Sequence, residues 1–105
     1  MDFDTFYKLV KGYTIKYPSG NDPFKITTRL LEEAGELAKE VNHHERTGVK
    51  IQKYGEPDRT HMAKEMHDVL RTVLTLTVYY NLTDELEKSI QETFDRFKED
   101  GYISD

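Results

Sequence analysis

The stretch from Asp58 to Tyr80 limits the folds open to this chain, because it contains no glycine or proline. Residues 72–78 alternate with a period of two and are rich in β-branched side chains, which alone favours a strand. A lone strand would have no partner elsewhere in the chain, so the uninterrupted stretch predicts one long helix. Its second half is apolar around most of the helix, more than the ~100°-wide stripe that a peripheral helix buries. We therefore expect part of this surface to meet a second copy of the chain.

Three further stretches carry apolar residues at steps of three and four, the pattern of an amphipathic helix. They span about residues 3–17, 24–44 and 83–100. The turn formers at 18–23 separate the first two, and a polar connection at 46–58 precedes the long third helix. Asp58 or Thr60 is predicted to cap that third helix, Thr83 to cap the last one, and Gly101 to end it. The prediction is an all-α four-helix bundle, assembled as a homo-oligomer.

Length and charge narrow the class of protein. A chain of 105 residues has room for a single core, so residues 1–105 are predicted to form one domain. The formal net charge of −5 and the absence of a basic stripe argue against nucleic-acid binding. There is no cysteine for a disulfide or a thiolate zinc site. Neither a signal peptide nor an apolar run of ~20 residues is present, so we expect a cytoplasmic protein without a membrane partner.

Two pairs of carboxylates have the same spacing on the second and third predicted helices. Glu33 and Glu36 lie three residues apart, as do Glu65 and Asp68, so each pair projects from about one turn of helix. In an antiparallel arrangement the four groups would converge, and their repulsion would require a compensating cation. Oxygen ligands favour a hard ion, Mg²⁺ or Mn²⁺. Glu32, beside the first pair, could then orient a metal-bound water.

Either pair alone is more often a solvated helix face than a metal site. Two observations favour the metal site here. Both pairs lie on or next to apolar faces of their helices. In addition, Gly35 inside a helix costs up to ~1 kcal/mol relative to alanine, which indicates close approach of another group.

Residues 29–43 (RLLEEAGELAKEVNH), followed by 65–70 (EMHDVL), resemble the MazG-like members of the all-α nucleoside triphosphate pyrophosphohydrolase superfamily. The resemblance covers about residues 24–83 and rests on the E-x-x-E and E-x-x-D motifs. It implies that Glu33, Glu36, Glu65 and Asp68 bind Mg²⁺ in a MazG-like bundle. It also implies attack of water on the α-phosphorus of a nucleoside triphosphate, with pyrophosphate as the leaving group, and a homodimer or a dimer of dimers.

Roles at the site are also predicted for residues around these motifs. Glu32 and Glu33 are the predicted catalytic carboxylates. Lys53 in the polar connection, His67 beside the aspartate and Arg96 in the last helix are predicted to contact the substrate. The aromatic residues of the first helix are assigned to the core, with Tyr13 or Tyr17 near the turn as alternative platforms for a nucleobase.

Other interpretations stay open from the sequence. Within the superfamily, the same apparatus could hydrolyse phosphoribosyl-ATP, dUTP or dCTP. In a different class, the chain would be a non-catalytic helical adaptor or regulatory module, with solvated carboxylates or a structural cation.

The histidines of the chain also allow structural and metal-binding interpretations. His43, at the end of the second helix, suits the helix dipole. With Glu40 it also forms half of a di-iron carboxylate motif, but the second half is missing. His61 is interpreted as a surface or capping group.

Overall fold

A computed structural model describes residues 1–45 and 55–104. These residues form four α-helices and no strand, which confirms the all-α prediction. The helices are α1 (Phe3–Lys16), α2 (Pro23–His44), α4 (Arg59–Tyr79) and α5 (Thr83–Glu99). None of the helices in the described parts of the chain is both long and apolar enough to cross a bilayer.

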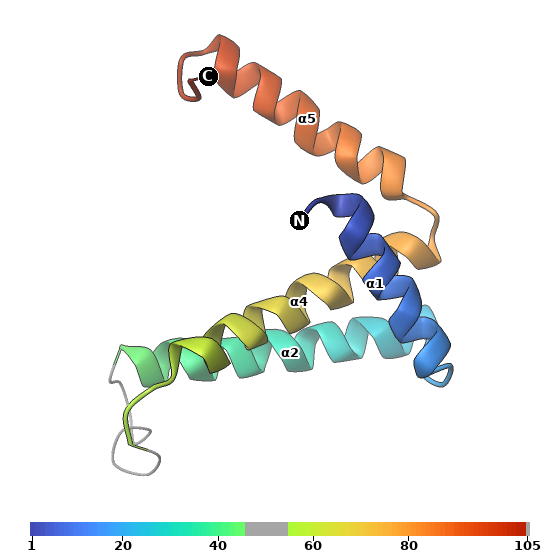
Figure 1. The fold of residues 1–105 in the computed structure, drawn as a ribbon, viewed down its shortest axis with the longest axis vertical. Helices are drawn as coiled ribbons and strands as arrows, with labels where there is room; N and C mark the ends of the chain where they lie inside the picture. Colours follow the sequence, from blue (N-terminus) through green and yellow to red (C-terminus); the bar gives the residue numbers. More distant parts are fainter. Residues whose placement is uncertain (46–54, 105) are drawn as a thin grey trace.

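Helices α2 and α4 form a long antiparallel hairpin, and α1 packs against the C-terminal half of α4 (Figure 1). Helix α5 turns away after α4 and meets it only near the connection between them (Figure 1). The radius of gyration is 17.0 Å, whereas a compact domain of this length has about 13 Å. The fold of one chain is therefore open, and α5 projects from it.

The stretch with the strand-like pattern is helical, and its threonines explain how. Thr72, Thr75 and Thr77 are buried, and each hydroxyl donates to the main-chain carbonyl four residues earlier, at 2.7, 2.8 and 3.1 Å. Because these hydroxyls are satisfied within the helix, they can be buried without an unpaired donor. The β-branched pattern therefore belongs to a helix rather than a strand, and its threonines are buried on more than one side of α4.

Aspartates cap three of the helices, with carboxylates that accept from main-chain N–H groups. Asp2 caps α1, Asp22 caps α2 and Asp58 caps α4, at 2.9, 3.0 and 2.9 Å. Asp58 is thus the cap of the long helix, one of the two candidates from the sequence. The capping role expected for Thr83 is wrong: Leu82 occupies the N-cap of α5, without a side-chain hydrogen bond. At the other end Gly101 adopts φ +85°, the left-handed conformation predicted there.

The apolar core of the described residues is small. Tyr7, Val10 and Leu74 are its buried members, and Phe6, Val78 and Leu86 pack against them. Ile26, at the start of α2, is completely buried as well. Many other apolar side chains of α2, α4 and α5 remain exposed in the single chain.

Truncation of Ile26 should therefore destabilise the fold. We expect Ile26→Ala to lower the free energy of unfolding by about 2–4 kcal/mol, because it removes buried methyl groups and leaves a cavity. Ile15→Ala is the matched control, since Ile15 is 81% exposed and should change stability by less than about 0.5 kcal/mol. Urea denaturation followed by circular dichroism measures both. Equal effects of the two substitutions would contradict this description of the core.

Candidate metal centre

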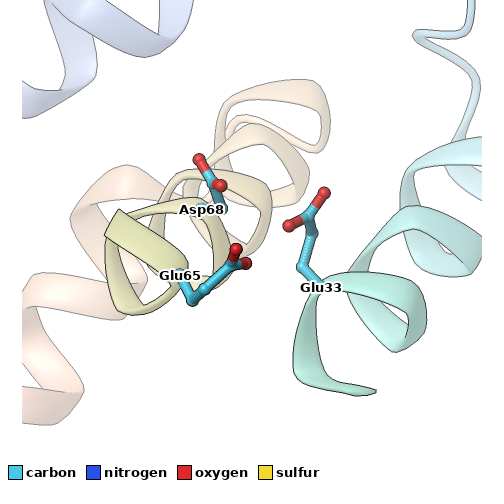
Figure 2. Close-up of side chains that lie close together, drawn as sticks. All are labelled: Glu33, Glu65 and Asp68. Carbon is cyan, nitrogen blue, oxygen red and sulfur yellow. The ribbon is translucent and has the colours of Figure 1, made fainter. Parts of the chain in front are cut away.

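Three carboxylates meet between the two long helices. Glu33 reaches across from α2 toward Glu65 and Asp68 of α4, and one oxygen of each lies within 4.8 Å of the others (Figure 2). Glu65 is buried, and the other two are partly buried. The structure thus brings together three of the four predicted metal ligands, from the two motifs identified in the sequence.

The face of α2 that packs on α4 explains why Glu33 belongs to this group. Going along the helix from Ile26, the more buried positions recur at steps of four and three, and they include Glu33, Leu37 and Glu40. A step of seven residues nearly completes two helical turns, so Glu33 and Glu40 lie almost in line.

The fourth predicted ligand, Glu36, lies beside this face rather than on it. It is rotated by about 60° from Glu33 around the helix axis. Its side chain is 55% exposed and pairs with Lys39 at 3.5 Å. In this conformation Glu36 does not join the other three, so its role as a ligand stays a prediction that requires its side chain to leave Lys39.

The electrostatic balance of the group is incomplete. Burial raises the pKa of Glu33, and the charges of Asp68 and Glu65 raise it further. Arg71 and Lys64 act in the opposite direction without cancelling this effect. Such a cluster of partly buried oxygen ligands, short of positive charge, fits a hard divalent cation such as Mg²⁺ or Mn²⁺.

Cations of α4 already contact one carboxylate of the group. Lys64 donates to Asp68 at 3.1 Å, and a guanidinium nitrogen of Arg71 lies 3.9 Å from the other carboxylate oxygen. Asp68 in turn raises the pKa of the Lys64 ammonium. Neither cation was singled out from the sequence, although their spacing of four and three residues from Asp68 on one helix would have indicated these contacts.

His61 has a more specific position than the surface or capping role expected for it. Its Nδ1 lies 3.0 Å from Glu40 of α2, and its Nε2 lies 3.3 Å from Glu65. The imidazole therefore bridges the two helices and holds the carboxylate of Glu65 from outside the group.

His43 is buried, with Nε2 at 2.6 Å from the carbonyl oxygen of Gly55. It fastens the end of α2 to the chain that leads into α4. Since Glu40 contacts His61 instead, the Glu40-x-x-His43 motif does not act as a ligand pair in this structure.

The remaining predicted site residues lie outside the carboxylate group. Glu32 is exposed and lines a shallow pocket on α2 that it shares with Arg29. His67 faces α1, where its ring lies 6.1 Å from that of Phe6. Arg96 is exposed on the projecting helix α5, with its guanidinium 5.7 Å from the ring of Phe97. Lys53 lies outside the described residues.

The raised pKa of Glu33 predicts a pH dependence with a defined sign. In the folded, metal-free protein this group binds its proton more tightly than in the unfolded chain, so stability should increase as the pH falls through the raised pKa. Cation binding should show the opposite trend, because it requires the ionised carboxylate. Melting curves in EDTA and Mn²⁺ titrations, both from pH 7 down to 4.5, measure the two trends. Glu33→Gln should flatten the stability trend, and an unchanged slope would contradict the assignment.

Comparison with known proteins bears on this geometry. The family model for the MazG nucleotide pyrophosphohydrolase domain matches residues 22–99, which contain all three clustered carboxylates. The chain belongs to the MazG family. The resemblance seen in the sequence motifs is therefore confirmed, and the match extends beyond those motifs to include α5.

A curated relative of this MazG-family chain is the "Uncharacterized protein YpjD" of Bacillus subtilis (strain 168). The two are 40% identical over 74 residues, which cover 70% of the present chain. The aligned part spans 59% of that relative's length. No solved structure matches the chain.

Proposed function

We propose that this chain is a Mg²⁺-dependent nucleoside triphosphate pyrophosphohydrolase, which converts a ribo- or deoxyribonucleoside triphosphate to the monophosphate and pyrophosphate. The observation that carries the proposal is the meeting of Glu33, Glu65 and Asp68 within 4.8 Å across α2 and α4. Membership of a family described as nucleotide pyrophosphohydrolases supports the type of reaction.

In this proposal, Glu33, Glu65 and Asp68 hold the cation, and Glu36 joins them as a fourth ligand. When bound, Mg²⁺ supplies positive charge that neutralises the phosphates and makes the attacking water more acidic. Glu32 or Glu33 orients that water and accepts its proton. The oxygen of water forms a bond to the α-phosphorus, the bond from that phosphorus to the bridging oxygen breaks, and pyrophosphate leaves with the electron pair.

His61 has a positioning role in this scheme. By bridging Glu40 and Glu65, at 3.0 and 3.3 Å, it restricts the rotamer of one ligand before the cation arrives. Contacts of this kind around a metal site orient the ligands and commonly alter metal affinity by about 10- to 100-fold.

Control of the cellular nucleotide pool, by removal of unwanted triphosphates, is the role that we propose for the reaction.

A second candidate function is a non-catalytic helical adaptor. Its support is the contact of Asp68 with Lys64 and Arg71, since carboxylates that already pair with cations can serve structure alone. In that case the group would be a structural ion-pair network or would hold a structural cation.

Pyrophosphate release separates the two candidates. The protein is incubated with each common ribo- and deoxyribonucleoside triphosphate in Mg²⁺, and pyrophosphate and monophosphate are quantified. We expect equal amounts of both products from at least one substrate, and none in EDTA. Absence of pyrophosphate with every nucleotide, from a folded protein that binds Mg²⁺, would favour the adaptor.

A further inference from the structure

A cavity of about 280 Å³ opens beside the carboxylate group, where α1, the turn after it, α2 and α4 meet. Aromatic rings and guanidinium groups line it. The residues that matter here are Tyr13, Tyr17, Arg29 and Arg71. Arg29 is already engaged, because it donates to the carbonyl oxygen of Gly20 at 2.9 Å. Arg71 is the cation that connects this cavity with the carboxylates.

The contacts of Arg71 place it at the boundary between the two. The centre of its guanidinium lies 4.4 Å from the centre of the Tyr13 ring, and one guanidinium nitrogen lies 3.9 Å from Asp68. The side chain is only 12% exposed. The contact with Asp68 is longer than a hydrogen bond, and the buried Nε–H has no hydrogen-bond partner among the described residues. The donors of Arg71 are thus only partly used in this state.

Lys64 offers a comparison within the same helix. It donates to the same carboxylate, Asp68, at 3.1 Å, but its side chain is 65% exposed and it does not line the cavity. The two cations therefore share one partner and differ in what else they can reach. A cation bound to the carboxylate group would compete with both for Asp68. Of the two, only Arg71 lines the cavity.

We propose that Arg71 exchanges partners. It pairs with Asp68 in the metal-free protein, and it binds the phosphate chain of the nucleotide once the carboxylates hold their cation. A planar guanidinium binds phosphate through paired hydrogen bonds, and its stacking on Tyr13 keeps it at the boundary throughout. This inference rests on the proposed function, since that function supplies the phosphate ligand.

The test uses binding alone, with Mg²⁺ and then the Mg²⁺ complex of inorganic triphosphate as probes, in calorimetry at pH 8. Arg71→Met removes the charge and keeps an apolar stem on Tyr13, and Lys64→Met is the matched control. Both variants should bind Mg²⁺ about two- to tenfold more tightly, because a competing cation is gone. Arg71→Met should bind triphosphate at least about tenfold more weakly, whereas Lys64→Met should stay within about twofold of the unchanged protein.

Three results would overturn the proposal. They are weaker Mg²⁺ binding by Arg71→Met, unchanged triphosphate binding by that variant, and no binding of triphosphate to the magnesium-loaded natural chain. If Arg71→Met does not fold, the Arg71 Nε–H resonance of the natural chain decides: it should shift when Mg²⁺ is added and again with triphosphate, and constancy would contradict the exchange. If only the proposed function were wrong, the result would be different: triphosphate would still bind through Arg71, but no nucleotide would be hydrolysed.

Discussion

Asp68→Asn and Glu33→Gln should each reduce nucleotide turnover by at least about 100-fold, with the helical circular dichroism retained. Both substitutions keep the size of the side chain and remove one charge from the group whose oxygens lie within 4.8 Å. A divalent cation held by fewer charged oxygens binds more weakly and is less well placed to neutralise the phosphates. Initial rates at saturating Mg²⁺, with the best substrate from the nucleotide panel, measure the effect. Near-normal turnover in either variant would show that the carboxylate group takes no part in the reaction.

The stability of the same variants in EDTA provides the internal control. For Glu33→Gln, removal of one like charge relieves repulsion in the group, so this variant should melt at the same temperature as the natural chain or higher. Asp68→Asn also loses the contacts with Lys64 and Arg71, so its melting temperature reports both effects. Burial is the main cause of the raised pKa of Glu33, and repulsion from Asp68 and Glu65 raises it further. A clear decrease in the melting temperature of Glu33→Gln would instead identify structural ion pairs. That outcome would support the adaptor.

Glu36→Gln examines the predicted ligand that lies apart from the three clustered carboxylates. The sequence motif predicts a loss of turnover as large as that for Asp68→Asn. The geometry adds a condition, since the carboxylate must first leave Lys39, 3.5 Å away. Lys39→Met, which removes that competitor, should therefore leave turnover intact or increase it. A full rate in Glu36→Gln would limit the ligand set to the three clustered carboxylates.

Phe94→Glu should disrupt self-association, the second large effect that we expect. We propose that the chain works as a homodimer or a dimer of dimers, because apolar side chains of α4 stay exposed, as expected from the sequence, and α5 presents an apolar face with little of the same chain against it. Ile90, Phe94 and Phe97 on this face are 47%, 44% and 43% exposed. A charge in the centre of such a face would have to be buried on assembly, at a cost of several kcal/mol. Sedimentation equilibrium should show multiples of 12.4 kDa for the natural chain and the monomer for Phe94→Glu.

Ser89→Glu is the control for this experiment, since it adds the same charge to α5 away from the apolar face. It should leave the assembly intact. A natural chain that sediments as a monomer and still hydrolyses nucleotides would contradict the proposal of assembly. Dissociation by Ser89→Glu as well would show a general effect of charge rather than an interface on this face.

The helices were predictable from the sequence because each carries a local signal. Apolar spacing delimits them, Asp58 and Gly101 mark two of their ends as predicted, and the cap predicted for α5 was wrong. The pairing of Glu33 with Glu65 and Asp68 also follows from spacing in an antiparallel arrangement of α2 and α4.

Side-chain partners across helices were less accessible to sequence reasoning. The rotation of α2 relative to α4 depends on packing along the whole interface, so the spacing of Glu33 and Glu36 did not reveal that Glu40 shares the inner face instead. For the same reason the bridge formed by His61 went unrecognised. The role of Arg71 was equally hidden, because it depends on the approach of α1, which brings Tyr13 against it.

Hydrolysis in water enriched in oxygen-18 locates the bond that breaks and the atom that is attacked. The natural chain, Mg²⁺ and the best nucleotide of the panel are incubated, and the products are resolved by phosphorus NMR. Attack at the α-phosphorus predicts one oxygen-18 atom in the nucleoside monophosphate and none in the pyrophosphate. Neither product should form in the Asp68→Asn reaction. Oxygen-18 in released pyrophosphate or orthophosphate, or label in the products of the Asp68→Asn variant at the same rate, would contradict a reaction carried out by these carboxylates.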